Sequence, residues 1–130
     1  MRDLEDFAGH WRLSRRIVQA DGPEARFEGE AVWTPDGAGL TCEERGLLQI
    51  GDQPALQGTR RYLWRPGLQV FFDDGRFFHA VPVEGGRAEH HCAPDHYVVD
   101  YDFSGWPSFA TVWTVEGPRK SYRMASTYTR

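Results

Sequence analysis

Cysteine is scarce in this 130-residue chain, which has only Cys42 and Cys92. Long hydrophobic runs are missing as well: no stretch approaches the ~20 apolar residues of a membrane-spanning helix. The first residues, Met1 to Asp6, lack the apolar core of a signal peptide. We therefore predict a cytoplasmic protein without a membrane span, in which both thiols are reduced and buried rather than joined in a disulfide.

Basic charge is neither in excess nor clustered. The chain has 15 Lys and Arg residues against 19 Asp and Glu residues, a formal net charge of -4, and the basic residues are scattered along it. A nucleic-acid interface or an anionic membrane surface calls for a concentrated basic patch. We expect neither of these partners.

Helical periodicity is absent after residue 9. A short helical turn is expected at the start, where Asp3 can cap it and Leu4 and Phe7 share one face. The rest combines 14% aromatic residues with 14 Gly and 8 Pro, and it alternates apolar and polar residues in about nine or ten short runs. This pattern predicts a single all-β domain over residues 1–130, an up-and-down antiparallel barrel whose closure removes exposed edges.

A hairpin is predicted at Asp74-Gly75, because this dipeptide between aromatic and β-branched runs is the strongest short hairpin signal. A two-residue loop there sets Val70 opposite His79 and Phe72 opposite Phe77. Counting by twos places all four side chains on the inner face. The barrel interior is therefore expected to contain a histidine.

A second hairpin is predicted with Gly85-Gly86 as its loop, and it would bring His79, His90 and Cys92 together on the inner face. Two imidazoles and a thiolate can bind zinc, and an axial histidine can bind haem. However, the spacing matches no zinc signature, and a neutral histidine bonded to a tyrosine or glutamate is the commoner arrangement. We predict no cofactor and keep these three residues as metal candidates. The outer face has two further histidines, His91 and His96.

Charged residues interrupt the inner face on neighbouring predicted strands. Glu44 and Arg60 fall at inward positions, and Arg15 interrupts the inner face of the first strand. Isolated burial of a charge costs several kcal/mol, so Glu44 and Arg60 are expected to pair. This pair either ties two strands together or presents Arg60 to a ligand carboxylate or carbonyl, with Glu44 fixing its orientation.

The N-terminal turn followed by Gly9-x-Trp11 and about ten meandering strands resembles the calycin superfamily of lipocalin-like and fatty-acid-binding-protein-like barrels. The resemblance implies that Trp11 packs beneath a basic residue of the last strand, Arg130 or Arg123. Five further motifs are similar to a bacterial family of uncharacterised calycin-like proteins, which brings no known activity. They are Glu44-x-Gly46, Arg60-x-Tyr62-x-Trp64, Asp74-Gly75-Arg76-x-x-His79, His90-x-Cys92 and Gly117-Pro118-x-Lys120-x-Tyr122.

Together these features predict that the barrel interior binds a small, mostly apolar molecule with one acidic or carbonyl end. Arg60 would hold the polar end. The expected ligand-binding residues are Glu44, Arg60, Tyr62, Phe72, Phe77, His79, His90, Tyr97, Tyr101, Trp113 and Tyr122. Further pocket walls are expected from Phe27, Trp33, Trp64, Val70 and Met124.

Two alternatives stay open. A cofactor-free acid–base enzyme of the lyase or isomerase type would use Glu44, Arg60, His79 and Tyr97, a set that loosely resembles the interior of phenolic-acid decarboxylases. Alternatively, side chains fill the barrel, because eight strands leave room for at most one small ligand. The domain would then serve as an interaction module.

Overall fold

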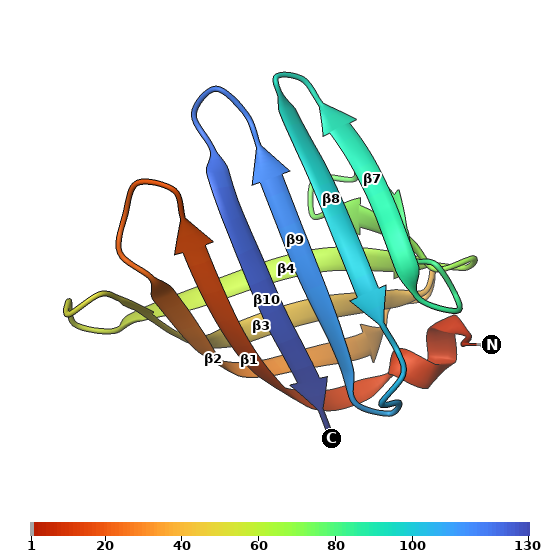
Figure 1. The fold of residues 1–130 in the computed structure, drawn as a ribbon. Helices are drawn as coiled ribbons and strands as arrows, with labels where there is room; N and C mark the ends of the chain where they lie inside the picture. Colours follow the sequence, from red (N-terminus) through yellow and green to blue (C-terminus); the bar gives the residue numbers. More distant parts are fainter. Residues whose placement is uncertain (1) are drawn as a thin grey trace.

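The computed structural model describes residues 2–130, and it confirms the all-β prediction with ten antiparallel strands (Figure 1). One short 3-10 helix, η1, covers Leu4–Phe7. No helix in the described residues is long and apolar enough to cross a membrane. The strands are β1 (Gly9–Gln19), β2 (Ala25–Pro35), β3 (Leu40–Ile50), β4 (Leu56–Arg65), β5 (Gln69–Phe72), β6 (Phe77–Ala80), β7 (Gly86–Cys92), β8 (Asp95–Asp102), β9 (Phe109–Glu116) and β10 (Ser121–Thr129).

The strands form one sheet in the order β6-β5-β4-β3-β2-β1-β10-β9-β8-β7. Strands adjacent in the chain are neighbours in the sheet with one exception: β6 and β7 stand at its two ends. The first and last strands, β1 and β10, pair with each other instead. The sheet curls so that β6 and β7 approach each other, but no ladder joins them in the described part of the chain. We call this unpaired meeting of β6 and β7 the seam.

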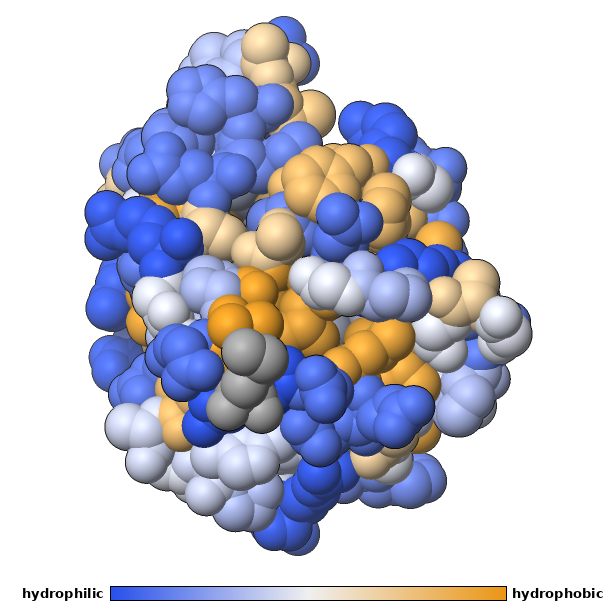
Figure 2. Space-filling view, turned by 90° about the vertical axis from the view of Figure 1, so that its right-hand side faces the viewer, coloured by the Kyte–Doolittle hydropathy of each residue, from blue (hydrophilic) through white to orange (hydrophobic). Residues whose placement is uncertain are grey.

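One end of the barrel is closed by aromatic side chains. Phe7 in η1 is completely buried, and its ring lies 5.0 Å from Trp64 and 5.6 Å from Phe109. The indole Nε1 of Trp11 donates a hydrogen bond of 2.9 Å to the Phe7 carbonyl. From the side that carries η1, apolar side chains are visible within a frame of polar ones (Figure 2).

Period-two alternation places the core as expected. Trp11 and Leu13 are buried from β1, and Ala31, Trp33 and Cys42 are buried from β2 and β3. These side chains project inward while their neighbours in sequence are exposed or half-exposed. The predicted inward-facing positions along the first strands are therefore confirmed.

A row of glycines crosses the middle of the inner face. Gly46 pairs with Gly29 on one side and with Gly58 on the other. A Cβ at Gly29 would lie 1.9 Å from the Arg45 carbonyl oxygen, and one at Gly46 would lie 2.3 Å from the Glu28 carbonyl oxygen. Strands β2 and β3 thus approach each other too closely for any side chain there.

The Asp74-Gly75 hairpin is present, but its register is only partly as predicted. Val70 faces His79 as expected, whereas the ladder then shifts so that Phe71 faces Phe77. The Phe72 amide donates to the Arg76 carbonyl and the Gly75 amide to the Phe72 carbonyl, so the loop is longer than two residues. The extra residue makes a bulge in which Phe78 and His79 are both buried. The prediction that Phe77 faces inward was wrong: it is 48% exposed.

The second predicted hairpin was wrong. Residues after β6 turn at Pro82 to Gly85, where the Gly85 amide donates to the Pro82 carbonyl. The chain does not fold back on β6; β7 pairs with β8, with His90 opposite Tyr97. A glycine pair between two apolar runs can end a turn without the two runs pairing as strands. Here Gly85 and Gly86 lie where the chain passes from β6 to β7, on the other side of the seam.

Candidate functional site

A network of buried polar side chains lies inside the barrel, and Arg15 and Glu44 form its centre. Arg15 Nη1 and Nη2 donate to the two Glu44 carboxylate oxygens at 2.8 and 3.1 Å. The Tyr128 hydroxyl donates to Glu44 Oε2 at 2.8 Å, and Arg15 Nε donates to the Ser126 hydroxyl at 2.7 Å. All four residues are at most 6% exposed. Two charges can be buried here because each is paired and hydrogen-bonded.

Arg15 reaches Glu44 across β2, which lies between their strands. Gly29 and Ala31 leave the space that larger inward side chains would fill, and the guanidinium lies 5.6 Å from the Phe27 ring centre. Burial opposes the charge of Arg15, but the facing Tyr128 and Glu44 outweigh it and raise its pKa. Burial and the Glu44 carboxylate also raise the pKa of Tyr128, which stays a hydroxyl donor.

The predicted ion pair between Glu44 and Arg60 is not formed. The two residues do face each other across β3 and β4, but Arg15 and Tyr128 occupy the Glu44 carboxylate. Arg60 is exposed and donates a long hydrogen bond of 3.4 Å to the Tyr62 hydroxyl. Within residues 2–130, no carboxylate forms an ion pair with its guanidinium. Arg60 is therefore a cation whose charge is not neutralised by a partner.

A small cavity lies beside Glu44 in the interior of the barrel. Its volume is about 30 Å³, enough for one or two water-sized molecules. The lining includes seven of the predicted binding residues or pocket walls: Glu44, Tyr62, Trp64, Val70, His79, Tyr101 and Trp113. Cys42, Phe78, Phe109, Thr111 and Tyr128 complete it. The deep interior is thus nearly filled by the protein's own side chains.

His79 is the histidine that lines this cavity. Its Nε2 lies 2.8 Å from the Tyr101 hydroxyl. Burial, with a smaller contribution from His90, lowers the pKa of His79 to about 3, so the imidazole is neutral near pH 7. Its Nδ1 and the hydroxyl of Thr111 are buried without a hydrogen-bond partner in the described residues. These two polar atoms can therefore form hydrogen bonds with a small polar molecule in the cavity.

A larger pocket of about 120 Å³ opens toward the end of the barrel opposite η1. We call this end the mouth. Arg15 forms the inner wall of the mouth pocket, and Arg60 lies at its rim. Between them lie Ile17, Phe27, Leu48, Gly58 and Thr59. Because Gly58 has no side chain, the space next to Phe27 stays open: a Cβ there would lie 3.2 Å from the Phe27 ring.

Apart from the outward-facing Phe77, the remaining predicted binding residues are Phe72 on β5, His90 on β7, Tyr97 on β8 and Tyr122 on β10. Tyr97 accepts a hydrogen bond of 3.1 Å from Lys120 Nζ, and burial raises the pKa of Tyr122. Phe72 stacks on Phe78 at 4.5 Å between ring centres, and His90 packs edge-on against both rings. These residues are half-buried, apart from the fully buried Phe78, so they line the mouth rather than a deep cavity.

The metal candidates His79, His90 and Cys92 do not converge. Their predicted meeting depended on the second hairpin, which the chain does not form. Cys92 instead lies 4.0 Å from Arg76 Nη1, and His79 is bonded to Tyr101. Both cysteines are free, as expected, although Cys92 is only half-buried. In residues 2–130, the cluster with metal-ligand geometry is Glu89, His91 and His96 on the outer face.

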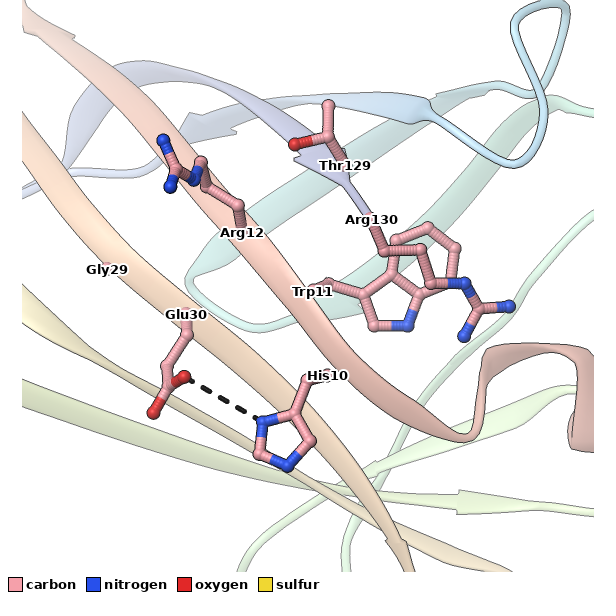
Figure 3. A pocket seen from close by; sticks show the side chains of 7 residues that line it. All are labelled: His10, Trp11, Arg12, Gly29, Glu30, Thr129 and Arg130. Carbon is pink, nitrogen blue, oxygen red and sulfur yellow. Dashed lines mark ion pairs between the residues drawn. The ribbon is translucent and has the colours of Figure 1, made fainter.

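A hollow with a volume of about 590 Å³ lies outside the barrel along β1 (Figure 3). It is shallow, and its His10 and Glu30 side chains are 3.8 Å apart. The Arg130 guanidinium lies 4.0 Å from the Trp11 ring centre and donates to the carbonyls of Ala8 and Asp6 at 2.8 and 2.6 Å. The expected basic residue above Trp11 is thus Arg130, not Arg123.

Sequence reasoning missed three members of the buried network: Arg15 as the partner of Glu44, and Ser126 and Tyr128. A signal was present, because all three share the inward parity of their strands. The alternation of inward and outward positions does not tell which of the two arginines at inward positions, Arg15 or Arg60, reaches Glu44. That choice depends on Gly29 and Ala31, which open the path across β2.

Comparison with protein families gives a match over almost the whole chain. Residues 7–130 match the family described as "Family of unknown function (DUF6314)". The chain belongs to this family. Membership covers every strand, from the closed end at Phe7 to Arg130. No curated protein matches the chain.

Among solved structures, the chain is similar to the S-type phycobiliprotein lyase CPES from Guillardia theta. The TM-score is 0.63 at 10% identity, over 98% of this chain and 89% of that chain. At such low identity the likeness shows the shared barrel fold alone. The DUF6314 chain and the lyase therefore share their architecture.

Proposed function

We propose that this DUF6314 protein binds a small, elongated apolar molecule by its acidic or carbonyl end in the mouth pocket. The single observation that carries the proposal is Arg60, a cation at the rim of an apolar pocket with no carboxylate ion-paired to it. An arginine fork favours planar oxygen acceptors such as carboxylates. The ligand's polar end would therefore lie at Arg60.

The electrostatics around Arg60 favour an anion. Arg15, on the inner wall, is the other charged group of the pocket, and it also repels the charge on Arg60. Burial raises the pKa of Tyr62 to about 12, so its hydroxyl stays protonated and can donate to a ligand oxygen. A guanidinium and a phenol thus converge where a carboxylate or carbonyl would bind.

The apolar part of the ligand has a surface to lie on at the mouth. Ile17 and Leu48 are half-buried in the pocket, and Leu56, which faces Leu48 across β3 and β4, is 57% exposed. A pocket of about 120 Å³ is smaller than the ~300 Å³ at which pockets for drug-sized ligands begin. Only the acidic or carbonyl end of the ligand therefore enters the pocket, and its apolar remainder lies along these side chains at the rim.

The calycin type of the barrel is part of this proposal. Trp11 beneath Arg130 is the contact that the resemblance implied, and a barrel of the same fold is named a phycobiliprotein lyase. A reducing compartment such as the cytoplasm suits the two free thiols, one of them buried next to Glu44. In this interpretation the fold acts as a scaffold for small-molecule binding, and residues at its mouth determine which molecule is bound.

Binding is favoured over acid–base catalysis by the space available. Both Glu44 oxygens accept hydrogen bonds, so this carboxylate is not a free base. His79 is neutral, as a base must be, but the cavity beside it holds nothing larger than one or two waters. A substrate confined to the mouth would not contact either group.

The test uses a dye with an apolar ring system and an anionic group, 8-anilinonaphthalene-1-sulfonate, followed by fluorescence. The wild type should bind it, and dodecanoate should displace it more effectively than dodecan-1-ol. Arg60→Ala should weaken binding of dodecanoate at least tenfold, because the pocket loses its unpaired cation. Native mass spectrometry of freshly purified protein would reveal a ligand that co-purifies.

Arg61→Ala is the matched control, since Arg61 is the next residue, points outward and pairs with Glu43 at 2.6 Å. It should leave dodecanoate binding unchanged. Equal binding by Arg60→Ala and the wild type, or equal displacement by the acid and the alcohol, would refute the proposed site.

A further inference from the structure

Three side chains meet on the outer face of the β7–β8 hairpin: Glu89, His91 and His96. His91 and His96 face each other directly in the ladder, and their ring centres are 3.9 Å apart. Glu89 lies two residues before His91 on the same side of β7, and its Oε2 is 3.3 Å from His96 Nε2. One ligand atom from each residue lies within 4.8 Å of the others.

This geometry fits a tetrahedral zinc site with one open position. Zinc bonds of about 2.0–2.1 Å to nitrogen and oxygen place tetrahedral ligand atoms about 3.3 Å apart. Glu89 and His91 are exposed and His96 is half-exposed, so their side chains can rotate over the small remaining distance. The backbone needs no change, because ladder pairing already fixes the two histidines side by side.

The residue types favour zinc over the hard cations. Two imidazoles and one carboxylate are a common zinc donor set, whereas calcium and magnesium prefer oxygen ligands throughout. Glu89 supplies negative charge to the site.

We propose that Glu89, His91 and His96 bind one Zn²⁺ on the outside of the barrel and clamp the free end of the β7–β8 hairpin. Strand β7 is an edge strand at the seam, where no ladder holds it to β6. On its inner face, His90 packs against Phe72 and Phe78 at the mouth. A zinc ion would therefore add a cross-link between this edge strand and β8, the strand that pairs with it. The site is independent of the pocket at Arg60.

The experiment uses the full chain without an affinity tag, stripped of metal by a chelator that is then removed. Zinc titration by calorimetry should give one Zn²⁺ per chain, and native mass spectrometry should show the same stoichiometry. Added Zn²⁺ should raise Tm. His91→Gln and His96→Gln should each weaken zinc binding at least tenfold and abolish the rise in Tm.

His10→Gln is the matched control, because His10 is also an exposed outer-face histidine beside a glutamate, Glu30, but has no second imidazole there. It should bind zinc as the wild type does. Absence of zinc binding, wild-type affinity in His91→Gln and His96→Gln, or half a zinc per chain would each overturn the assignment. Circular dichroism of the metal-free variants checks that they remain folded.

Discussion

The two ends of the barrel are built from the same ten strands but in opposite ways. At the closed end, Phe7, Trp11, Trp33 and Phe109 are buried and in ring contact with one another, and Arg130 covers Trp11. At the mouth, inward positions carry half-buried or exposed residues such as Leu48, Leu56 and Arg60, and a pocket remains open.

This difference separates the main source of stability from the proposed binding pocket within one barrel. The closed end buries large aromatic surfaces, and each such ring contributes several kcal/mol to folding. The mouth contributes little burial and leaves a charged group without an ionic partner. Substitutions should therefore lower stability at the closed end and ligand affinity at the mouth, with the Arg15–Glu44 network between the two.

The largest effect is expected from Trp11→Ala at the closed end. The substitution removes a 1%-exposed indole that packs on Phe7, Trp33 and Phe109, and it should lower the free energy of unfolding by about 3–5 kcal/mol. Leu56→Ala at the mouth is the comparison, with an expected change within about 0.5 kcal/mol. Urea unfolding measures both. Similar losses in the two variants would remove the contrast between the ends.

Glu44→Gln should cost about 3 kcal/mol, because it leaves the buried Arg15 guanidinium without its counter-charge. The double variant Arg15→Met with Glu44→Gln removes the orphaned charge and should regain part of the loss. Chemical denaturation of the single and double variants tests this. A double variant less stable than Glu44→Gln would show that Arg15 is not held by Glu44.

Acid should weaken the fold through His79. Its pKa is about 3 when folded and 6.5 in the unfolded chain, so below pH 6.5 the unfolded state binds a proton that the folded state does not. Stability is full above pH 6.5 and falls as the pH drops, by about 2 kcal/mol between pH 7.5 and pH 5. In His79→Gln, the loss of stability between pH 7.5 and pH 5 should be smaller by about 2 kcal/mol. His10→Gln should keep the wild-type slope.

Arg130→Ala should cost about 1 kcal/mol, because it removes the cation above Trp11 and two hydrogen bonds to backbone carbonyls of the N-terminal segment. Arg123→Ala, an exposed site on the same strand, should change the free energy of unfolding by less than about 0.5 kcal/mol. Thermal unfolding compares the two. Equal effects would contradict the role assigned to Arg130.

The smallest effect on folding is expected from Arg60→Ala. Arg60 is exposed and makes one long hydrogen bond to Tyr62, so the free energy of unfolding should change by less than about 0.5 kcal/mol. A larger loss would mean that the mouth also carries stability.

Most of the fold could be predicted from local patterns. Alternation identified the strands and their inner faces, because the sheet has one wet and one buried side. The helical turn with Leu4 and Phe7 and the basic residue over Trp11 are also confirmed. Register was predictable as far as Val70 and His79, but one bulge residue then moved Phe77 outside and Phe78 inside.

The candidate site was less predictable because it depends on strands distant in sequence. Glu44 and Arg60 are neighbours in the ladder, yet Arg15 from β1 takes the carboxylate by passing over Gly29 and Ala31. A count along single strands contains no information about such a path. The failed second hairpin has the same origin, since nothing local shows that the chain crosses the seam instead of pairing.

The position of the seam has one more consequence. Starting at β7, the strands follow one another in the sheet as β7 to β10 and then β1 to β6. This is the order of the chain after a circular permutation between β6 and β7. A circular permutant that starts at Gly86, joins the old termini through a linker and stops at Ala80 would keep every hydrogen-bonded strand pair. In the described chain, the seam is the one place where neighbouring strands of the barrel are not joined by a hydrogen-bonded ladder. Residues 81–85 connect β6 to β7 there, so the backbone itself joins the two edges of the sheet.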